Sequence, residues 1–575
     1  MKKQRIGVYI CHCGGNIADV VDVERVAHAV EDYPGVVVAK NLMFVCSDAG
    51  QKEIYDDIHN LHLDGVVVAS CSPKLHEITF MNTVERAGLN RYEFYHVNIR
   101  EDVSWAHSDD PEGATNKAIR EVKAGINYVR LTQPLEEIKV SIYNTVLIIG
   151  GGIAGLRCAI DTAKMGSNVI IVEKIDRLGG NVCQIHATYP DGESGREVVN
   201  KFLRELHEYK DKVKILLNSE ISDISGYVGN FEVNIKSNDT LETTHAEVGS
   251  IIIATGFASY QPSEGEFGYK ISDRIVTLPE FLKILKKKDF DEKVIYNGNI
   301  INSVGFIYCV GSRQEQSYDE TKKTNEYCSR FCCNATIYTS SILHKQYNMR
   351  TYHFFRDMRT YGKYEQYYID ARNQGAIFLK YDLNDPPLIH AKSNKIHVVV
   401  KDILTENEKI TVPLDLLVLV TGMEAKENTT LNDIIRVSIG IDGFYKESHP
   451  KLKPVETERM GIILAGSCQA PRDISETIAS ASAASAKAST IVRKAELKLN
   501  PAVAIIDPDK CQGHENCIAV CPVNAIEKKD QKPWVNDALC IGCGACTAVC
   551  PNEAIQIKTL KNDQIKEMIL ALAPK

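Results

Sequence analysis

The chain has 575 residues, a net charge of −8 and 25% charged residues. A chain of this length is too long to fold around one hydrophobic core, so we expect three or four domains. The charge balance, without a basic stripe or arm, argues against a nucleic acid as partner. No apolar run approaches the ~18 residues of a membrane span, and the amino terminus lacks the apolar core of a signal peptide, so we expect a cytoplasmic protein.

Eighteen cysteines are the most informative part of the composition. A disulfide scaffold is normally short and secreted, whereas grouped cysteines in a long reduced chain indicate metal binding or redox chemistry. Cys158, Cys183 and Cys468 stand apart, and the other cysteines fall into three groups along the chain.

The first group lies in a predicted amino-terminal domain. Cys11 and Cys13 follow I-G-V-Y-I, Cys46 follows N-L-M-F-V, and Cys71 follows D-G-V-V-V-A-S, with helical segments between them. In a parallel α/β sheet the carboxyl ends of the strands lie along one edge, where ligands collect. The pattern predicts a parallel-sheet α/β domain that holds a 4Fe–4S cluster. The alternative is that these cysteines are ordinary buried residues.

The end of this domain carries no chemistry that spacing alone can assign. Residues 86–107 include N-I-R-E-D-V-S-W-A-H, in which we expect Trp105 and His107 to be packing or interface residues. The domain is predicted over residues 1–135, with L-T-Q-P at 131–134 as the linker.

A dinucleotide-binding fingerprint follows. Residues 145–156 read T-V-L-I-I-G-G-G-I-A-G-L, an apolar strand that runs into Gly150, Gly152 and Gly155. A second strand, N-V-I-I-V-E-K, ends at Glu173, about 20 residues further on, where an acid accepts from ribose hydroxyls. The glycines allow a tight turn and a close backbone approach to the pyrophosphate at a helix amino terminus.

Three later segments favour FAD over NAD as the nucleotide. R-L-G-G-N at 177–181 and I-I-I-A-T-G-F at 251–257 are similar to loops of flavoproteins that have two dinucleotide-binding domains. A-G-S-C-Q-A-P-R-D-I-S-E-T resembles their second FAD motif, which places Asp473 on the ribityl chain. The predicted FAD contacts in these segments are Arg177, Gly179, Gly180, Asn181, Thr255, Gly256, Gly466, Asp473 and Ile474. Residues 141–497 therefore resemble a thioredoxin-reductase-like body.

Two features of such reductases are missing from this body. It has no C-x-x-C pair in the position of a thiol–disulfide centre, and N-S-V-G-F-I-Y-C-V-G-S-R replaces the second glycine fingerprint. We infer that NAD(P)H binding at that place is lost or weak. Cys309 and the run Y-C-S-R-F-C-C-N, with Cys328, Cys332 and Cys333, predict a further cluster. Buried free cysteines are the alternative.

An internal repeat marks the carboxyl-terminal module, predicted over residues 500–558. The second copy is a complete C-x2-C-x2-C-x3-C-P, and the first copy has a histidine in the second position. The module resembles a two-cluster bacterial ferredoxin, in which three cysteines of one motif and the fourth of the other bind each cluster. This resemblance assigns one cluster to Cys540, Cys543, Cys546 and Cys521, and the second to Cys511, Cys517 and Cys550 with His514 in the fourth place. A zinc ribbon is the less specific alternative.

The role of His514 stays open between two alternatives. A neutral imidazole ligand would raise the reduction potential, as in Rieske centres. In the rival interpretation three cysteines hold a 3Fe–4S cluster and His514 turns away. Residues 559–575 are predicted to form a helix that docks on the body or on a partner.

The motifs together resemble HdrA, the iron–sulfur flavoprotein of heterodisulfide reductases, over essentially the whole chain. They are C-H-C-G-G-N, M-F-V-C-S-D, A-S-C-S-P-K-L-H-E, N-I-R-E, G-G-G-I-A-G-L, C-V-G-S-R, Y-C-S-R-F-C-C-N and P-R-D-I. One departure is clear, because the cysteines of the ferredoxin module inserted in methanogen relatives are lacking between Gly180 and Cys309. Glu280 in L-P-E-F and Lys363 in R-T-Y-G-K-Y are candidates near the flavin ring, with an ordinary solvated charge as the alternative for each.

The resemblance implies one FAD, about four clusters, and flavin-based electron bifurcation or confurcation in a multi-subunit complex. The expected partners are the HdrB- and HdrC-like subunits that carry the substrate chemistry, a ferredoxin and an electron-input subunit, with the chain forming a dimer within the complex. The alternatives are a non-bifurcating adaptor like that of quinone-interacting membrane oxidoreductases, and the analogous subunit of a benzoyl-CoA reductase complex. A stand-alone NAD(P)H-dependent disulfide reductase is disfavoured by the two missing features.

Overall fold

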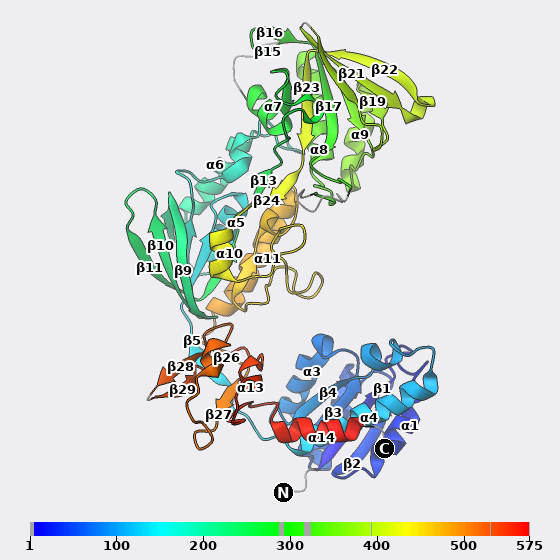
Figure 1. Cartoon of the computed structure of the whole chain (residues 1–575), viewed down its shortest axis with the longest axis vertical. Helices are drawn as coiled ribbons and strands as arrows, with labels where there is room; N and C mark the ends of the chain where they lie inside the picture. Colours follow the sequence, from blue (N-terminus) through cyan, green and yellow to red (C-terminus); the bar gives the residue numbers. More distant parts are fainter. Residues whose placement is uncertain (1–4, 287–292, 316–323, 393, 530, 574–575) are drawn as a thin grey trace. The chain divides into compact units, whose positions relative to one another are not determined.

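Figure 1 shows the computed structural model, which describes residues 5–286, 293–315, 324–392, 394–529 and 531–573. The chain forms two compact units, Met1–Val140 with Lys498–Lys575, and Ser141–Leu497. The amino-terminal and carboxyl-terminal segments thus belong to the same unit. Within the described part of the chain, every helix is too short or too polar to cross a membrane.

A four-stranded parallel sheet forms the centre of the amino-terminal domain. Its order is β2 (Val36–Leu42), β1 (Ile6–Cys11), β3 (Gly65–Ser70) and β4 (Phe94–Asn98). The helices are α1 (Val23–Glu31), α2 (Asp48–Asn60), α3 (Pro73–Arg86) and α4 (Pro111–Arg130), and a π-helical turn spans Arg100–Ser104. Every residue of β1 and β3 is buried, as expected of central parallel strands covered on both faces.

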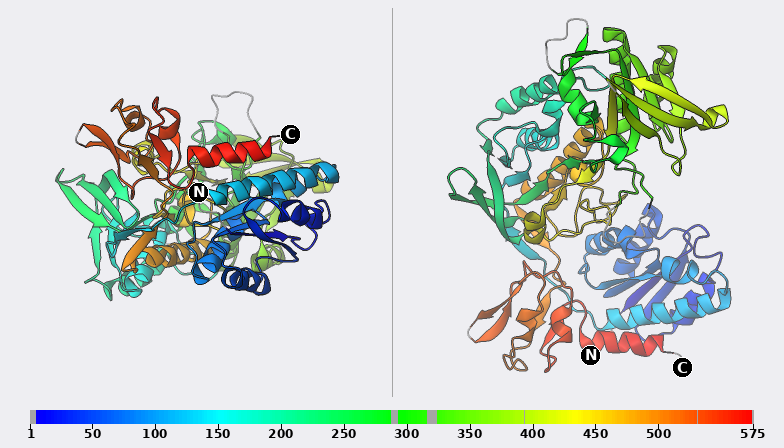
Figure 2. Two further views of the ribbon diagram at one scale, coloured as in Figure 1. Left: turned by 90° about the horizontal axis from the view of Figure 1, so that it is seen from below. Right: turned by 45° about the horizontal axis from the view of Figure 1, so that its top comes forward.

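The last helix of the chain, α14 (Asn562–Leu572), lies along α4 of this domain (Figure 2). The Tyr128 hydroxyl donates to the carbonyl of Thr559 at 2.6 Å, and Asn127 Nδ2 donates to the carbonyl of Glu567 at 3.1 Å. Met568 packs against the apolar core of the domain. The sequence predicted docking on the flavoprotein body or on a partner, but the helix closes back onto the amino-terminal domain because α4 presents apolar and polar partners for it.

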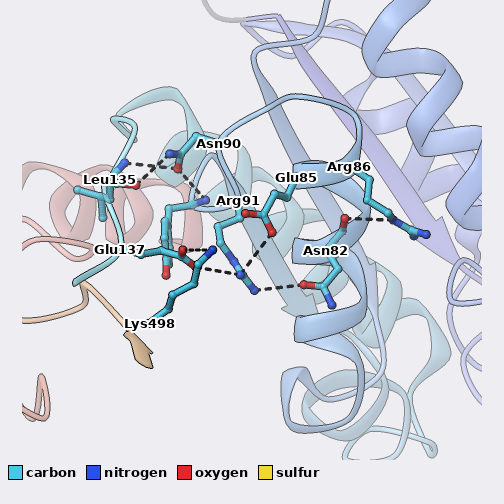
Figure 3. A network of polar contacts seen from close by, with 9 residues as sticks. Asn82, Glu85, Arg86, Asn90, Arg91, Leu135, Glu137 and Lys498 are labelled. Carbon is cyan, nitrogen blue, oxygen red and sulfur yellow. Dashed lines mark hydrogen bonds and ion pairs between the residues drawn. The ribbon is translucent and has the colours of Figure 1, made fainter. Parts of the chain in front are cut away.

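A polar network ties the segments that enter and leave this unit (Figure 3). Glu137 accepts from Arg91 Nη1 at 3.2 Å and from Lys498 Nζ at 2.7 Å. These partners lower the pKa of Glu137, with the hydrogen bond from Lys498 as the largest cause. Asn90 Nδ2 donates to the carbonyl of Leu135 at 2.9 Å, so the loop before β4 also holds the predicted linker region.

The carboxyl-terminal module repeats one pattern of strand, cysteine loop, short helix and strand. The first copy is β27 (Ala504–Ile506), α12 (Asn516–Ala519) and β28 (Ile526–Lys529); the second is β29 (Lys532–Val535), α13 (Ala545–Ala548) and β30 (Ile555–Ile557). β27 pairs with β30 and β28 pairs with β29, both antiparallel, so each strand of one copy pairs with a strand of the other.

The second unit contains two parallel sheets, each of the kind that binds dinucleotides. The first has the order β25 (Ile462–Leu464), β12 (Ser250–Ile253), β6 (Thr145–Ile149), β7 (Asn168–Val172) and β8 (Val213–Leu216). Helices α5 (Ile153–Lys164), α6 (Gly195–His207) and α11 (Ile474–Val492) belong to it, with an antiparallel meander of β9 (Ser219–Tyr227), β10 (Asn230–Ser237) and β11 (Thr243–Val248). The small residues of α11 let it pack closely on α5, as Cys158 Sγ and the Ala481 carbonyl, 3.4 Å apart, illustrate.

The second sheet has the order β14 (Ile275–Thr277), β23 (Leu416–Thr421), β17 (Ser303–Val310), β18 (Arg350–Phe355) and β19 (Ile377–Lys380). Its helices are α7 (Leu278–Leu285), α8 (Cys332–Tyr347) and α9 (Glu365–Asn373), and an antiparallel sheet of β20 (Leu388–Lys392), β21 (Lys395–Asp402) and β22 (Glu408–Leu414) accompanies it.

The remaining elements are short. They are the paired strands β13 (Phe257–Ser259) and β24 (Met423–Ala425), β15 (Val294–Tyr296) and β16 (Asn299–Ile301), β5 (Ile138–Ser141) and β26 (Glu496–Leu499), and helix α10 (Thr429–Ile435). The fold class predicted from the sequence is confirmed: a parallel-sheet α/β domain, a body with two dinucleotide-binding sheets, and a doubled α+β module.

Candidate flavin and cluster sites

The glycine fingerprint forms a tight turn between β6 and α5. Gly150 has φ +111° and donates its N–H to the Val172 carbonyl at 2.8 Å. A Cβ on Gly155 would lie 1.9 Å from the Gly150 carbonyl oxygen, so only glycine lets α5 start this close to the strand. The Glu173 carboxylate accepts from the Gly151 N–H at 2.7 Å, which brings the predicted ribose-binding acid to the loop.

The R-L-G-G-N loop lies beside this turn. The Gly179 N–H donates to the Gly151 carbonyl at 2.8 Å, and the nearest atom to a Cβ on Gly152 would be Gly180 Cα at 4.0 Å. The backbone therefore leaves room above Gly152, as close approach of a pyrophosphate requires. Asn181 Nδ2 donates to the Phe257 carbonyl at 3.3 Å.

Two predicted contacts of this part differ in their surroundings. Arg177 is exposed and pairs with Asp176 at 3.1 Å. Gly256 has φ +75° and no atom within 4 Å of its Cβ position, and the carbonyl of neighbouring Thr255 accepts from Lys426 Nζ at 2.7 Å.

Sequence reasoning missed Lys426. Burial lowers the pKa of this ammonium, and the nearby Glu173 carboxylate raises it. The ammonium of this exposed side chain thus lies beside Thr255 and close to Glu173, two residues of the predicted nucleotide-binding segments. The sequence offered only one hint of it, since Lys426 directly follows the apolar strand L-L-V-L-V-T-G-M-E-A. That segment matches none of the motifs used above.

The second FAD motif forms the amino terminus of α11. Asp473 caps this helix through Oδ1, which accepts from the Glu476 N–H at 2.7 Å, and Ile474 is its first residue. Asp473 Oδ2 accepts from the Tyr361 hydroxyl at 3.4 Å. Gly466, with φ +72°, donates its N–H to Ser480 Oγ at 3.0 Å, which holds the motif against the helix.

Three buried polar groups gather near this corner without a hydrogen-bond partner among the described residues: the Tyr189 hydroxyl, the Asn334 side-chain amide and Arg472 Nη1. Burial raises the pKa of Tyr189, and the charge of Asp473 raises it further. Leaving such groups unpaired is costly, so their presence fits a polar ligand. The ribityl chain and ring edge of FAD offer suitable partners.

Glu280 makes several hydrogen bonds within the body, whereas Lys363 is exposed. The Glu280 carboxylate accepts from the Thr277 N–H at 2.7 Å and from the Tyr269 hydroxyl at 3.3 Å, which completes a capping box at the start of α7. The sequence T-L-P-E already carried that capping signal. Neither contact involves the glycine fingerprint or Asp473.

The central cysteines come together after β17. Cys309 has φ +62° at the end of this strand, and Cys332 and Cys333 begin α8. Burial raises the pKa of the Cys309 thiol, and the charges of Cys333, Cys309 and Cys328 all act on Cys332. The four predicted ligands therefore lie near one another.

Two arginines lie beside Cys309 of this central group. Arg313 Nη1 lies 3.9 Å from Cys309 Sγ, and Arg356 donates to the carbonyls of Ser312 and Arg313 at 3.1 and 2.8 Å. In a dinucleotide-binding sheet this strand-to-helix connection would carry the glycine loop. Here a Cβ on Gly311 would lie 2.0 Å from the Tyr260 ring, so an aromatic side chain covers the turn.

The amino-terminal cysteines also converge. The Cys13 N–H lies 3.3 Å from Cys11 Sγ, and Cys13 has φ +54°. Burial raises the pKa of Cys71 to about 11, and the charges of Cys13 and Cys46 act on it in the same direction. Strands β1, β2 and β3 thus bring four thiols to one edge of the sheet, as the sequence pattern predicted.

The carboxyl-terminal module contains a small cavity whose lining includes Cys521, Cys540, Cys543 and Cys546. These are the four residues that the ferredoxin resemblance assigns to one cluster. Ile526, Ile541 and Ile557 supply apolar walls.

The other set surrounds Cys517, whose pKa is raised by burial and by the charges of Cys511 and Cys550. His514 is exposed in this structure, like Cys543, its equivalent in the second copy. Among the described residues no three His, Cys, Asp or Glu side chains converge on a single metal ion. The four ligands of a 4Fe–4S cluster each bind a different iron of the cube, so they need not converge on one point.

Comparison with known proteins finds two family models and several similar chains. Residues 144–298 match the model of the pyridine nucleotide-disulphide oxidoreductase family, and residues 501–561 match that of the LdpA Fe-S cluster-binding domain. A thioredoxin reductase structure from T. acidophilum covers 60% of this chain and 96% of its own, with 20% identity and a TM-score of 0.39.

Two curated relatives match nearly the whole chain. One is a subunit of the H(2):CoB-CoM heterodisulfide,ferredoxin reductase of Methanothermobacter thermautotrophicus, 34% identical over 94% of this chain and 93% of its own. The other is a CoB--CoM heterodisulfide reductase iron-sulfur subunit of Methanopyrus kandleri, 33% identical over 92% of each. The protein is an oxidoreductase subunit that uses FAD and iron–sulfur clusters for electron transfer. By identity and coverage the chain belongs to the HdrA family of heterodisulfide reductase iron–sulfur flavoproteins.

Proposed function

We propose that this protein carries out flavin-based electron bifurcation or confurcation within a multi-subunit oxidoreductase complex. When bound, FAD supplies the exchange between a two-electron donor and one-electron carriers. The observation that carries the proposal is the position of Asn334, because it directly follows Cys333 on α8 and its unpaired amide belongs to the polar groups near Asp473. A cluster site and the predicted flavin corner therefore share one helix.

The residues of the body have separate tasks in this proposal. Gly150, Gly152 and Gly155 bind the pyrophosphate through backbone N–H groups at the start of α5, and Glu173 accepts from the ribose. Asp473 at the head of α11 orients the ribityl chain, while the helix amino terminus favours negative charge on the ring.

Tyr189 and Asn334 complete this site as hydrogen-bond partners of the flavin. The Asn334 side chain is buried and the Tyr189 side chain is half-buried, and the amide and the hydroxyl are both without a hydrogen-bond partner among the described residues. Arg330 links the central cysteine loop to the same corner, because its Nη2 pairs with Glu476 and its Cζ lies 5.6 Å from the centre of the Tyr361 ring.

About four clusters are proposed for the cysteine groups, one in the amino-terminal domain, one in the body and two in the carboxyl-terminal module. Each group offers thiolates, which donate charge to iron. Three separate cysteine groups in one chain supply carriers for electrons that leave the flavin along different routes. A disulfide reductase does not need such carriers.

The partners proposed are the subunits that carry the substrate chemistry, a ferredoxin and an electron-input subunit, with this chain as a dimer in the complex. Support comes from the names of the relatives, which describe subunits of an H(2):CoB-CoM heterodisulfide,ferredoxin reductase and of a ferredoxin:CoB-CoM heterodisulfide reductase. Which disulfide or other acceptor this complex reduces depends on those partners.

The test is purification of the native complex, identification of its subunits, and a coupled electron-transfer assay. We expect one FAD and about sixteen iron atoms per chain, four for each of four clusters. A two-electron donor should reduce ferredoxin only together with a high-potential acceptor, with one electron to each. Reduction of either acceptor alone at the full rate would identify a non-bifurcating adaptor, and stoichiometric zinc would exclude the cluster assignment.

A further inference from the structure

All four strands of the amino-terminal sheet end at the cysteine group. β1 leads to Cys11 and Cys13, β2 is followed by Cys46, and β3 is followed by Cys71. The fourth strand, β4, ends at Asn98 and is followed by Arg100. Because parallel strands have their carboxyl ends on one edge, β4 brings a guanidinium to the edge where the other three strands bring thiols.

Arg100 reaches two members of the cysteine group. Its Nη1 lies 3.5 Å from Cys13 Sγ, within the range of a hydrogen bond to sulfur. Its charge also acts on Cys71, where it lowers the thiol pKa against the dominant effect of burial. The guanidinium therefore contacts Cys13 directly and is close enough to Cys71 for its charge to act there.

The surroundings hold this guanidinium in place. Arg100 Nη2 and Nε both bond Glu101 Oε1, at 2.7 and 3.3 Å, and Arg100 Cζ lies 4.7 Å from the centre of the Trp105 ring. Only 15% of the Arg100 side chain is exposed, so solvent and salt screen its charge weakly. Glu101 compensates part of that charge, with its Oε2 buried and unpaired among the described residues.

The backbone that carries Arg100 is also tied to the cysteine loop. Residues 100–104 form a π-helical turn, a rare conformation that occurs frequently at functional sites. The Glu101 N–H donates to Asn98 Oδ1 at 3.2 Å, and Ser104 Oγ donates to the carbonyl of Asn16 at 2.7 Å. The turn and the loop after Cys13 therefore keep a fixed relation.

We propose that Arg100 is a positioning residue that raises the reduction potential of the amino-terminal cluster, with Glu101 limiting the effect. The inference rests on the proposed function, which places a cluster at these four cysteines. One-electron reduction adds one negative charge to the cluster and its thiolates. A nearby, weakly screened cation stabilises the more negative state and also donates a hydrogen bond to a ligand sulfur, and both effects favour reduction.

The experiment uses the full chain with its clusters, followed by EPR during a titration with dithionite and mediators. A Cys46→Ser, Cys71→Ser variant first identifies the amino-terminal signal as the one that it loses. In Arg100→Gln, which removes the charge, the equilibrium constant for one-electron reduction should fall at least tenfold, a negative shift of about 59 mV. Arg100→Lys should shift it less, and Glu101→Gln should shift it in the positive direction.

Arg25→Gln is the matched control. Arg25 belongs to the same domain, and its guanidinium contacts Glu112 and Asn116 at 2.6 and 2.9 Å, so the variant should leave the signal in place. An unchanged potential in Arg100→Gln with full iron content overturns the proposal. A negative shift of the potential in Glu101→Gln also overturns it. Glu101→Gln therefore tests the proposal even if Arg100→Gln fails to hold iron. If the double cysteine variant loses no iron, the cluster assignment itself has failed, independently of Arg100.

Discussion

His514 and Cys543 occupy equivalent positions in the two halves of the carboxyl-terminal module, and both are exposed. The residues after them, Glu515 and Gly544, both have positive φ, +61° and +77°, and cap the short helices α12 and α13. The backbone has thus kept the conformation of a ligand loop although the thiol is absent. This geometry is compatible with an imidazole that turns toward the cluster.

If His514 is a ligand, His514→Cys should lower the potential of the cluster held by Cys511, Cys517 and Cys550. A thiolate in place of a neutral imidazole adds negative charge, and we expect at least a tenfold change, about 59 mV for one electron. Redox titration followed by EPR measures it. A three-iron EPR signal in the parent protein, together with no change in the variant, would favour the rival in which His514 turns away.

Cys46→Ser, Cys71→Ser should remove about four iron atoms per chain, because a cluster that loses two of its four ligands is released. Iron analysis and absorbance measure the loss. Cys158→Ser, Cys468→Ser is the matched control, since both thiols are buried and hydrogen-bonded to the carbonyls of Ala481 and Ile253, and it should keep all its iron. Equal iron in the two variants would contradict the assignment.

Asn334→Leu should weaken FAD binding and stabilise the protein without FAD. The buried amide has no protein partner among the described residues, so its removal spares about 1–3 kcal/mol of unsatisfied desolvation in the apoprotein. In the flavin complex the same change removes a hydrogen bond, and we expect about tenfold weaker binding. Calorimetry with and without FAD separates the two effects.

Thr336→Val is the control for this prediction. Thr336 is equally buried on α8 with an unpaired hydroxyl, but two residues further along a helix it faces a different direction. The valine should stabilise both forms and leave FAD affinity unchanged. Unaltered affinity in Asn334→Leu would remove Asn334 from the flavin site.

His353 should make the flavoprotein body sensitive to acid. Burial lowers its pKa from 6.5 to about 3, and its ring accepts or donates to the Tyr308 and Ser340 hydroxyls while it stacks on Phe378 at 4.4 Å. Between these two pH values His353 is protonated in the unfolded chain and neutral in the folded chain. The stability is full above about pH 6.5 and is lost toward pH 3, by at most about 1.4 kcal/mol per pH unit.

Thermal unfolding between pH 7 and pH 5 measures this dependence. The slope should become shallower in His353→Phe, which keeps the aromatic stack, and should persist in His245→Gln, because His245 is exposed on β11. An identical slope in the parent protein and His353→Phe would assign the acid sensitivity to other groups.

The fold and much of the site could be predicted from the sequence because the signals are local. A strand followed by cysteine, a glycine turn after a strand, and a repeated cysteine motif each reflect a few neighbouring residues whose spacing sets the chemistry. In this way Cys11, Cys46 and Cys71 were predicted to meet, and Gly150 and Glu173 were predicted to share one loop. The structure brings both sets together.

The residues that sequence reasoning missed act across distance in the chain. Arg100 reaches Cys13, Lys426 reaches Thr255, and Asn334 joins the corner of Asp473. Arg100 and Asn334 stand in the motifs N-I-R-E and Y-C-S-R-F-C-C-N, but a motif does not tell which distant residues these side chains face. Glu280, a candidate by family likeness, completes a helix cap whose signal was present in T-L-P-E, and its place near the flavin ring stays a prediction.

The sequence by itself determined which short segments are candidates for binding clusters and nucleotide, since thiolate spacing and glycine turns are properties of short segments. The tertiary structure decided which charges and unpaired polar groups face those segments. It also decided that α14 closes on α4 of the amino-terminal domain. Such contacts depend on how sheets and helices pack, because the free energy of a side chain is set by whatever neighbours the fold brings to it.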